Sequence, residues 1–249
     1  MNSSMSLVHY PSHKSIIILS TYGSEFLPFL LAELEKTVGL QEVGVLLDGE
    51  IKEKDKRIVV ERTAGFFEWP KFSSIEKYEV PLFVVENHNG EKSQELLRKI
   101  QPELILNGGT PRILKQPLFS LASHGILNVH PGILPKYRGC TCVEWALYND
   151  DPVGATCHFM DEGIDTGPIV YVKEMAIQKG EIYEQVRAHM IQHTAQVLAN
   201  GTQMVVEKNM KITDVAAQEG GQYFHVISEK ELQIAKERLA KQEYSHYAT

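Results

Sequence analysis

The feature that most constrains the fold is the start of the chain, where an apolar run is followed by a tight turn and an amphipathic helix. Residues 14–20 read as a buried strand centred on three isoleucines, and Ser24 is a residue type that caps helices. Apolar residues then recur at helical spacing, at Phe26, Leu27, Leu30, Leu31 and Leu34. A strand, turn and helix in this order predict the first unit of an α/β domain.

The alternation continues along the chain. Further strands are expected at residues 42–47, 81–85, 103–106, 126–130, 153–160 and 169–177, and helices at 91–100, 141–148, 181–198 and 229–241. The charged and aromatic segment 48–72 has little periodicity, so an irregular insertion is expected there. This pattern predicts a Rossmann-like, mostly parallel twisted sheet with flanking helices, in which 153–160 and 169–177 can pair antiparallel. We expect a disordered tail at 1–13, one α/β domain at 14–200 and a small helical extension at 201–249.

The central strand carries polar residues at its end. Asn128 and His130 are two residues apart, so they point to one face of an extended strand, and Pro131 then ends the strand because it has no N–H to donate. Open α/β sheets bind ligands at the carboxyl ends of their strands. An acidic loop with two glycines follows at 160–168, and we expect its Asp165 to return to His130.

Three stretches together resemble the folate-dependent formyltransferase family. They read Asn-Val-His-Pro at 128–131, Leu-Pro-Lys-Tyr-Arg-Gly at 134–139 and Asp-Glu-Gly-Ile-Asp-Thr-Gly at 161–167. The family includes glycinamide ribonucleotide transformylase, the catalytic domain of methionyl-tRNA formyltransferase and N-formyltransferases that act on amino sugars. The similarity is dense over residues 103–177 and faint after about residue 200. It implies the formyltransferase fold, with residues 14–200 as the catalytic domain, and 10-formyltetrahydrofolate as the formyl donor.

The resemblance also implies which residues form the site. Those matching the catalytic residues of the family are Asn128, His130 and Asp165. Those expected to hold the pterin ring of the donor, largely through the main chain, are Arg112, Ile113, Leu114, Met160, Asp161, Gly163 and Ile164. Those expected to contact the acceptor substrate are Gly132, Lys136, Tyr137 and Arg138. A cis peptide bond is expected between Leu134 and Pro135.

The three catalytic residue types suit acyl transfer to an amine. The amide of Asn128 can donate a hydrogen bond to the oxyanion that forms when an amine attacks the formyl carbon. The imidazole of His130 can take a proton from the amine and return one to the leaving nitrogen of the folate. Asp165, directly or through an ordered water, would orient the imidazole and favour its cation. No covalent enzyme intermediate is required.

The turn after the first strand bears on which amine is formylated. The segment 21–25 reads Thr-Tyr-Gly-Ser-Glu, where the glycinamide ribonucleotide enzymes have a Gly-x-Gly-Ser-Asn type of turn that holds substrate phosphate. A carboxylate at Glu25 would repel a phosphate there. The favoured acceptor is therefore a nucleotide-linked amino sugar, whose nucleotide would stack on Tyr223 or Phe224. Glycinamide ribonucleotide remains an alternative, as do hydrolysis of the donor and a folate-binding domain without activity.

The composition limits the kinds of molecule that the protein is expected to bind. The net charge is −7 and no long basic run is present, so nucleic acid is not an expected partner. The extension after the long helix is also too short and too acidic for the basic barrel of the methionyl-tRNA enzymes. No apolar run approaches the roughly 20 residues of a membrane span. A cytoplasmic homodimer that acts on a small molecule is expected.

Cysteine and histidine spacing gives no metal site. The chain has three cysteines and no secretory context, so reduced thiols are expected. Cys140 and Cys142 are two residues apart, and His189 and His193 are four apart, but neither pair has the further ligands that a zinc site needs.

Overall fold

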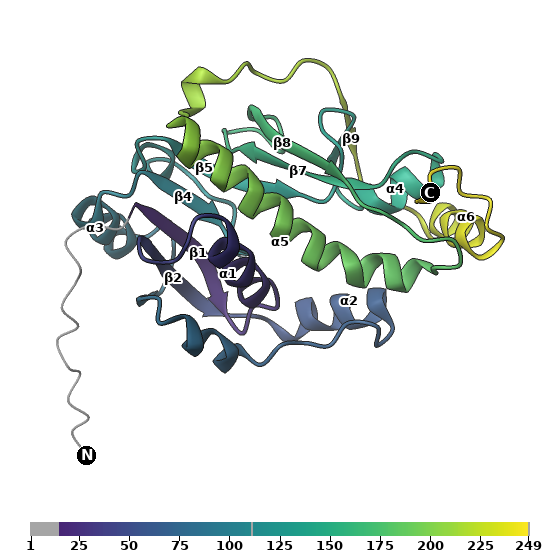
Figure 1. The fold of residues 1–249 in the computed structure, drawn as a ribbon, viewed down its shortest axis with the longest axis horizontal. Coiled ribbons are helices and arrows are strands. Elements are labelled where there is room, and N and C mark those ends of the chain that lie inside the picture. Colours follow the sequence, from purple (N-terminus) through teal and green to yellow (C-terminus); the bar gives the residue numbers. More distant parts are fainter. Residues whose placement is uncertain (1–14, 111, 249) are drawn as a thin grey trace.

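The computed structural model describes residues 15–110 and 112–248; the tail expected at 1–13 lies outside these residues. Seven strands form one sheet in the order β3-β2-β1-β4-β5-β7-β8 (Figure 1). Their bounds are β1 Ile16–Tyr22, β2 Val43–Glu50, β3 Leu82–Val85, β4 Leu104–Asn107, β5 Gly125–His130, β7 Gly154–Phe159 and β8 Ile169–Glu174. The first five strands of this order are parallel, and β7 and β8 are antiparallel to their neighbours. The expectation of a mostly parallel sheet with an antiparallel final pair is confirmed.

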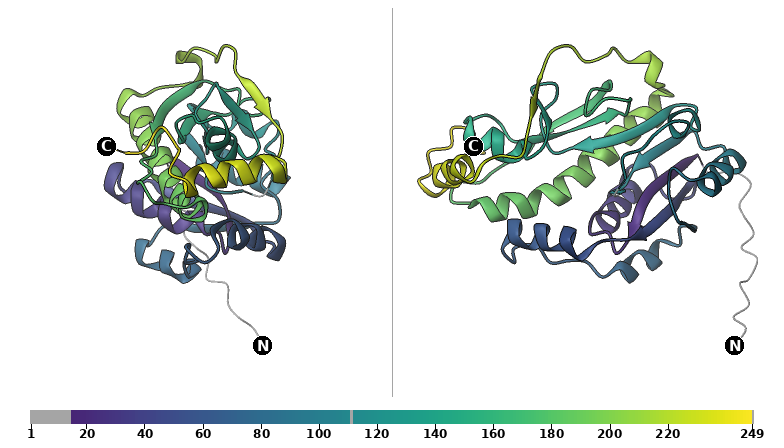
Figure 2. Two further views of the ribbon diagram at one scale, coloured as in Figure 1. Left: turned by 90° about the vertical axis from the view of Figure 1, so that its right-hand side faces the viewer. Right: turned by 180° about the vertical axis from the view of Figure 1, so that it is seen from behind.

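Helices cover both faces of the sheet. They are α1 Phe26–Thr37, α2 Glu53–Thr63, α3 Glu91–Ile100, α4 Cys142–Tyr148, α5 Tyr183–Lys208 and α6 Glu229–Ala240. Alternate residues of β1 divide between two apolar clusters, as the period of two along a strand requires. Ile16 and Ile18 belong to the cluster under α1 and α5, whereas Ile17 and Leu19 belong to the cluster under α3 and the segment 114–122. Figure 2 shows α5 lying along one face of the sheet.

The segment 48–72 contains a helix that its sequence pattern did not predict. α2 has acidic residues in its first turn and ends at Ala64 in the left-handed conformation. Its only buried side chain is Thr63, so it has no continuous apolar stripe by which sequence periodicity could find it. The expectation of an irregular insertion was therefore wrong for residues 53–63.

The long helix continues past residue 200, where the sequence predicted its end and the start of an extension. Asn200-Gly201 resembles a helix end. In the structure Gly201 instead allows α5 to approach β7, because a Cβ added there would lie 2.3 Å from Cys157 Sγ. The helix continues to Lys208.

The C-terminal segment packs against the loop after β5 and against α4. Two short strands that the sequence did not predict, β6 Tyr137–Gly139 and β9 Gln222–Phe224, pair in parallel outside the main sheet. α6 then packs against α4 (Figure 1). The peptide bond between Leu134 and Pro135 is cis, as expected. The three cysteines are free thiols, and no helix in the described ranges has both the length and the apolarity to cross a bilayer.

Candidate active site

Polar side chains gather at the ends of β4 and β5, next to the point between β1 and β4 where the strand order of the sheet reverses. Asn107 ends β4 and donates from Nδ2 to Oδ1 of Asn128 at 2.8 Å, while its own Oδ1 accepts from the backbone N–H of Thr110 at 3.1 Å. These contacts fix which way the amide of Asn128 points. Its NH₂ group, the part that can donate to a substrate oxygen, therefore faces away from Asn107.

The acidic loop brings Asp165 to His130, as the sequence predicted. Asp165 Oδ2 lies 3.3 Å from His130 Nδ1 and accepts from the backbone N–H of Gly139 at 3.0 Å. Asp165 has a φ of 54°, an unusual backbone conformation for a non-glycine residue. Gln218 holds the loop by donating to the backbone oxygen of Asp165 at 3.2 Å. Residues from β5, the acidic loop and the C-terminal segment thus fix one carboxylate beside the imidazole.

The imidazole of His130 is enclosed by the protein. It is only 4% exposed, and its Nε2 lies 2.8 Å from the backbone oxygen of Tyr137. Burial lowers the pKa of His130, and Asp165 together with the Tyr137 carbonyl opposes that change. A neutral ring can donate to only one of these two oxygens, whereas the cation can donate to both. Both nitrogens of His130 therefore already have partners within the protein.

His158 is a fourth polar residue of the site, and sequence reasoning did not select it. It lies opposite Asn128 in the β5–β7 pair. Its Nδ1 donates to the backbone oxygen of Phe159 at 2.8 Å, so its Nε2 can accept from the Nδ2 of Asn128 at 3.2 Å. Burial lowers the pKa of His158, which favours this neutral form. The signal that could have revealed it is the pairing of β7 with β5, whereas the sequence suggested a partner for β7 only in β8.

The segment after β4, expected to bind the pterin, is anchored by its side chains. The guanidinium of Arg112 forms two hydrogen bonds with the buried carboxylate of Asp48 and donates to the backbone oxygen of Glu86 at 3.0 Å. Asp48 also accepts from the backbone N–H of His88 at 2.8 Å. Burial raises the pKa of Asp48, but the hydrogen bonds from Arg112 and His88 outweigh it and leave the pKa below its usual value. Arg112 thus holds the segment after β4 in position.

Asn89 holds the next part of this segment. It donates to the backbone oxygen of Ile113 at 3.0 Å and accepts from the backbone N–H of Lys115 at 2.9 Å. Between them, the backbone of Leu114 has no hydrogen-bond partner in the described part of the chain. The side chain of Ile113 is 82% exposed, whereas that of Leu114 is buried. The segment therefore presents an apolar side chain and unpaired peptide groups together.

The acidic loop lies beside the same apolar cluster. Met160 packs against the cluster that contains Leu114, and its backbone N–H donates to Ile126 at 2.7 Å. The carboxylate of Asp161 accepts from the backbone N–H of Gly163 at 3.0 Å, which closes a turn. Ile164 at the end of this turn is 60% exposed. The two segments predicted to hold the pterin therefore both pack against the apolar cluster that contains Leu114.

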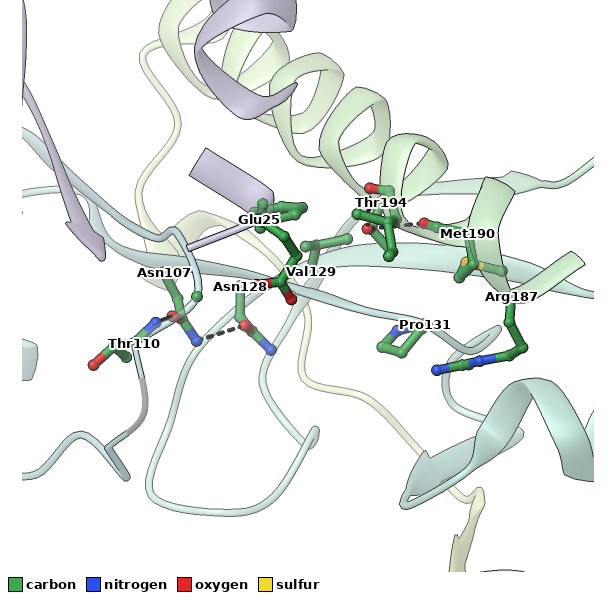
Figure 3. A pocket seen from close by; sticks show the side chains of 12 residues that line it. Glu25, Asn107, Thr110, Asn128, Val129, Pro131, Arg187, Met190 and Thr194 are labelled. Atoms are coloured by element: carbon green, nitrogen blue, oxygen red, sulfur yellow. Dashed lines mark hydrogen bonds between the residues drawn. The ribbon is translucent and has the colours of Figure 1, made fainter. Parts of the chain in front are cut away.

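A pocket of about 290 Å³ opens at the strand ends next to Asn128 (Figure 3). Its walls come from the start of α1, the ends of β4 and β5, and the first half of α5. Among the described residues lining it, the only charged ones are Glu25 and Arg187. Figure 3 shows the side chains of both pointing into the pocket, from α1 and α5 respectively.

The four residues expected to contact the acceptor do not line this pocket. Gly132 packs against the His130 ring, with room for no side chain, since an added Cβ would lie 2.6 Å from Nε2. Tyr137 is buried, and its hydroxyl donates to Asp151. Lys136 pairs with the same Asp151 at 2.6 Å, and Arg138 donates to a backbone oxygen of the C-terminal segment at 3.3 Å. Lys136, Tyr137 and Arg138 thus hold the loop after β5, and their contact with an acceptor stays a prediction.

The two aromatic residues considered for nucleotide stacking differ in exposure. Phe224 is buried and stacks on Tyr137 with 5.0 Å between ring centroids. Tyr223 is partly exposed. Phe224 is therefore part of the packing between β9 and the loop after β5, and only Tyr223 presents a ring face to solvent.

Comparison with known proteins identifies the family of this chain. A family model described as formyl transferase matches residues 14–202. Methionyl-tRNA formyltransferase of Thermotoga maritima is 30% identical over 140 residues, which are 56% of this chain and 45% of that protein. The chain thus spans less than half the length of this curated relative.

Several solved structures share the fold. A sugar N-formyltransferase from Shewanella sp. has a TM-score of 0.58 at 21% identity, with 88% of this chain and 87% of that chain covered. Glycinamide ribonucleotide transformylase 1 from Symbiobacterium toebii has a TM-score of 0.59 at 18% identity, with 87% and 99% covered. The formyltransferase PseJ from Anoxybacillus kamchatkensis, solved with a UDP-linked formamido sugar and tetrahydrofolate, has a TM-score of 0.51 at 18% identity, with 86% and 88% covered. With a family match over most of its length and this strand order, the chain belongs to the formyl transferase family.

Proposed function

We propose that this protein transfers the formyl group of 10-formyltetrahydrofolate to the primary amine of a small molecule, and that the acceptor is a nucleotide-linked amino sugar. The observation that carries the proposal is the contact between His130 and Asp165 at the end of β5, with Asn128 linked to the same carboxylate through His158. Any one of these residues alone has ordinary structural explanations. Together, next to an open pocket, they supply a donor for an oxyanion and a buried group that can hold a proton.

Asn128 is suited to bind the developing oxyanion. Its Oδ1 is held by Asn107, and one N–H of its Nδ2 is directed at His158. The other N–H is then the group that donates to the oxygen of the attacked formyl carbon, in a position fixed before the substrate binds. His130 and Asp165 would supply the proton that the leaving nitrogen takes up when the bond to the formyl carbon breaks.

The residues present fit a folate donor. A pterin ring is flat and carries donors and acceptors along its edge, so it needs apolar surface beside free peptide groups. The main chain around Leu114, with the apolar surface of Ile113, Met160 and Ile164, provides this combination. We assign Arg112, Asp161 and Gly163 to shaping these two segments.

The acceptor would occupy the pocket beside Asn128. A sugar-sized amine fits a volume of about 290 Å³, and Arg187 supplies a positive charge for a phosphate of a linked nucleotide. The sugar N-formyltransferase among the structural neighbours supports this acceptor. Methionyl-tRNA is the second candidate acceptor, because one similar curated protein is named methionyl-tRNA formyltransferase. The net charge of −7 weighs against a tRNA acceptor.

The proposal is tested by incubating the protein with 10-formyltetrahydrofolate and a set of nucleotide-linked amino sugars, glycinamide ribonucleotide or methionyl-tRNA. The product is identified by the mass of one added formyl group. Formylation of a sugar supports the proposal, and formylation of either other acceptor replaces the sugar as substrate. Release of formate without any amine would identify a hydrolase instead.

Substitutions test the site independently of the acceptor. Asn128→Ala, His130→Ala and Asp165→Ala should each leave a folded protein whose turnover is lower by about 10²–10⁴. Circular dichroism and thermal melting check the fold. Near-normal turnover in two of the three variants would refute the catalytic assignment.

A further inference from the structure

Glu25 is a carboxylate that lines the pocket beside Asn128. It stands at the start of α1, yet its side chain does not cap the helix. Ser24 does so instead, accepting from the backbone N–H groups of Phe26 at 3.2 Å and Leu27 at 3.3 Å. The Glu25 side chain is thereby left to extend into the pocket (Figure 3).

The surroundings of Glu25 leave its charge uncompensated. It is half-buried, and within the described part of the chain no cationic side chain forms an ion pair with it. Burial raises the pKa of Glu25, a hydrogen bond to its own backbone opposes this, and the negative charge of Asp55 on α2 adds to the rise. The other charged group of the pocket, Arg187, lies on α5 and is 3.6 Å from the buried Glu144. An unpaired carboxylate in such a place is costly unless a ligand supplies the partner.

Formyl transfer requires such a group. A primary amine resembles the lysine side chain, with a pKa of about 10.4, so about one molecule in 10³ is uncharged near pH 7. The ammonium form has no lone pair and cannot attack. Asn128 cannot accept its proton, and the His130–Asp165 pair is assigned to the leaving nitrogen of the folate. The proton of the incoming ammonium therefore needs another acceptor that faces the pocket.

We infer that Glu25 binds the ammonium group of the acceptor and removes its first proton. This inference rests on the proposed function. One N–H bond of the ammonium breaks and its proton passes to a Glu25 carboxylate oxygen, leaving the lone pair that forms the bond to the formyl carbon. As the formyl carbon separates from the folate nitrogen, the His130–Asp165 pair gives that nitrogen one proton and is reprotonated by the second amine proton. The proton on Glu25 returns to solvent through the pocket, so the reaction releases one proton overall.

Glu25 in this role also affects which acceptors bind in the pocket. A carboxylate at this end of the pocket attracts a cation and repels a phosphate. The amine of the acceptor is thus directed toward Glu25 and Asn128, and an anionic part toward Arg187 at the α5 wall. One pair of charges would then set the orientation of the acceptor.

Kinetics of Glu25→Gln test the inference, with Glu35→Gln as the matched control. Glu35 is an exposed residue of the same helix, so the control loses the same charge away from the pocket. With the acceptor found by the screen, Glu25→Gln should lower kcat/KM near pH 7 by about 10²–10⁴. The deficit should shrink as pH rises toward the pKa of the amine, because free amine then becomes available. A deficit independent of pH, or one equal to that of Glu35→Gln, would overturn the inference.

A second measurement does not depend on turnover. The carboxyl carbon of Glu25 is followed by NMR in protein labelled at glutamate carboxyl groups, with its signal identified by its loss in Glu25→Gln. Ethanolammonium chloride should lower the pKa of Glu25 relative to sodium chloride at the same ionic strength. Identical titrations would rule out an ammonium site. If this shift is seen but no amine is formylated, the ammonium site stands and the proposed function fails.

Glu25→Gln should also melt no lower than the unmodified protein. The carboxylate has no ion pair among the described residues, and glutamine has nearly the same shape. A large loss of thermal stability would show that Glu25 serves the fold rather than the substrate.

Discussion

Replacing Asp48 by alanine should both destabilise the protein and weaken donor binding. Its carboxylate is 0% exposed and accepts hydrogen bonds from Arg112 and from the backbone N–H of His88. Without it, the His88 N–H is buried with no acceptor, which costs about 1–3 kcal/mol. The Arg112 side chain is 37% exposed and can be hydrated, so the loss of its ion pair with Asp48 adds only about 0–1 kcal/mol. We expect a total loss of about 1–4 kcal/mol in the free energy of unfolding.

Urea denaturation measures this loss, and steady-state kinetics measure its consequence. Arg112 no longer anchors its segment in Asp48→Ala, so the KM for 10-formyltetrahydrofolate should rise several-fold while the KM for the acceptor stays unchanged. Asp48→Asn is the control, since its amide oxygen can still accept from His88, and it should lose only about 1 kcal/mol. A loss below about 0.5 kcal/mol in Asp48→Ala, or equal changes in both KM values, would refute this account of the anchor.

Two further predictions concern the core and the buried histidines. Gly108→Ala should lower the stability by about 1–3 kcal/mol, because the new Cβ would lie 2.3 Å from Ile18 Cγ2, and a melting temperature equal to that of the unmodified protein would contradict the tight packing. Burial lowers the pKa of four histidines below 6.5, so the unfolded state binds more protons in acid and stability should be full above about pH 6.5 and fall below it. The free energy of unfolding should change by at most about 1.4 kcal/mol per pH unit for each histidine, as measured by urea denaturation at several pH values. A protein that is more stable in acid would contradict this prediction. These histidines are His88, His130, His158 and His193.

The sequence predicted the parts of the fold that local pattern determines. Apolar runs located the strands of the sheet, and the motifs around Asn128 and Asp165 predicted a contact that the structure contains. α2 was missed because it buries almost nothing, and the full length of α5 was missed because Gly201 serves a contact with β7. His158 was missed because its part in the site depends on the β5–β7 register, which no local pattern encodes.

The loop after β5 and the pocket beside Asn128 show a related limit. Lys136, Tyr137 and Arg138 belong to a motif that indicates the family, yet they hold the loop after β5 in place. The pocket beside Asn128 is instead lined by α1 and α5, whose sequences carry no recognisable motif. A motif locates the chemistry, whereas the walls of a binding pocket depend on how distant helices pack.

Successive residues of β5 face opposite sides of the sheet. Ile126 belongs to the apolar cluster beside the donor segments, whereas Leu127 belongs to the cluster under α1 and α5. Changes on the surfaces of α1 and α5 can therefore reshape the space proposed for an amine while the opposite side of the sheet, with the segments expected to hold the donor, stays as it is. Such a division would let one ancestral scaffold acquire new acceptors repeatedly without reinventing its source of one-carbon units.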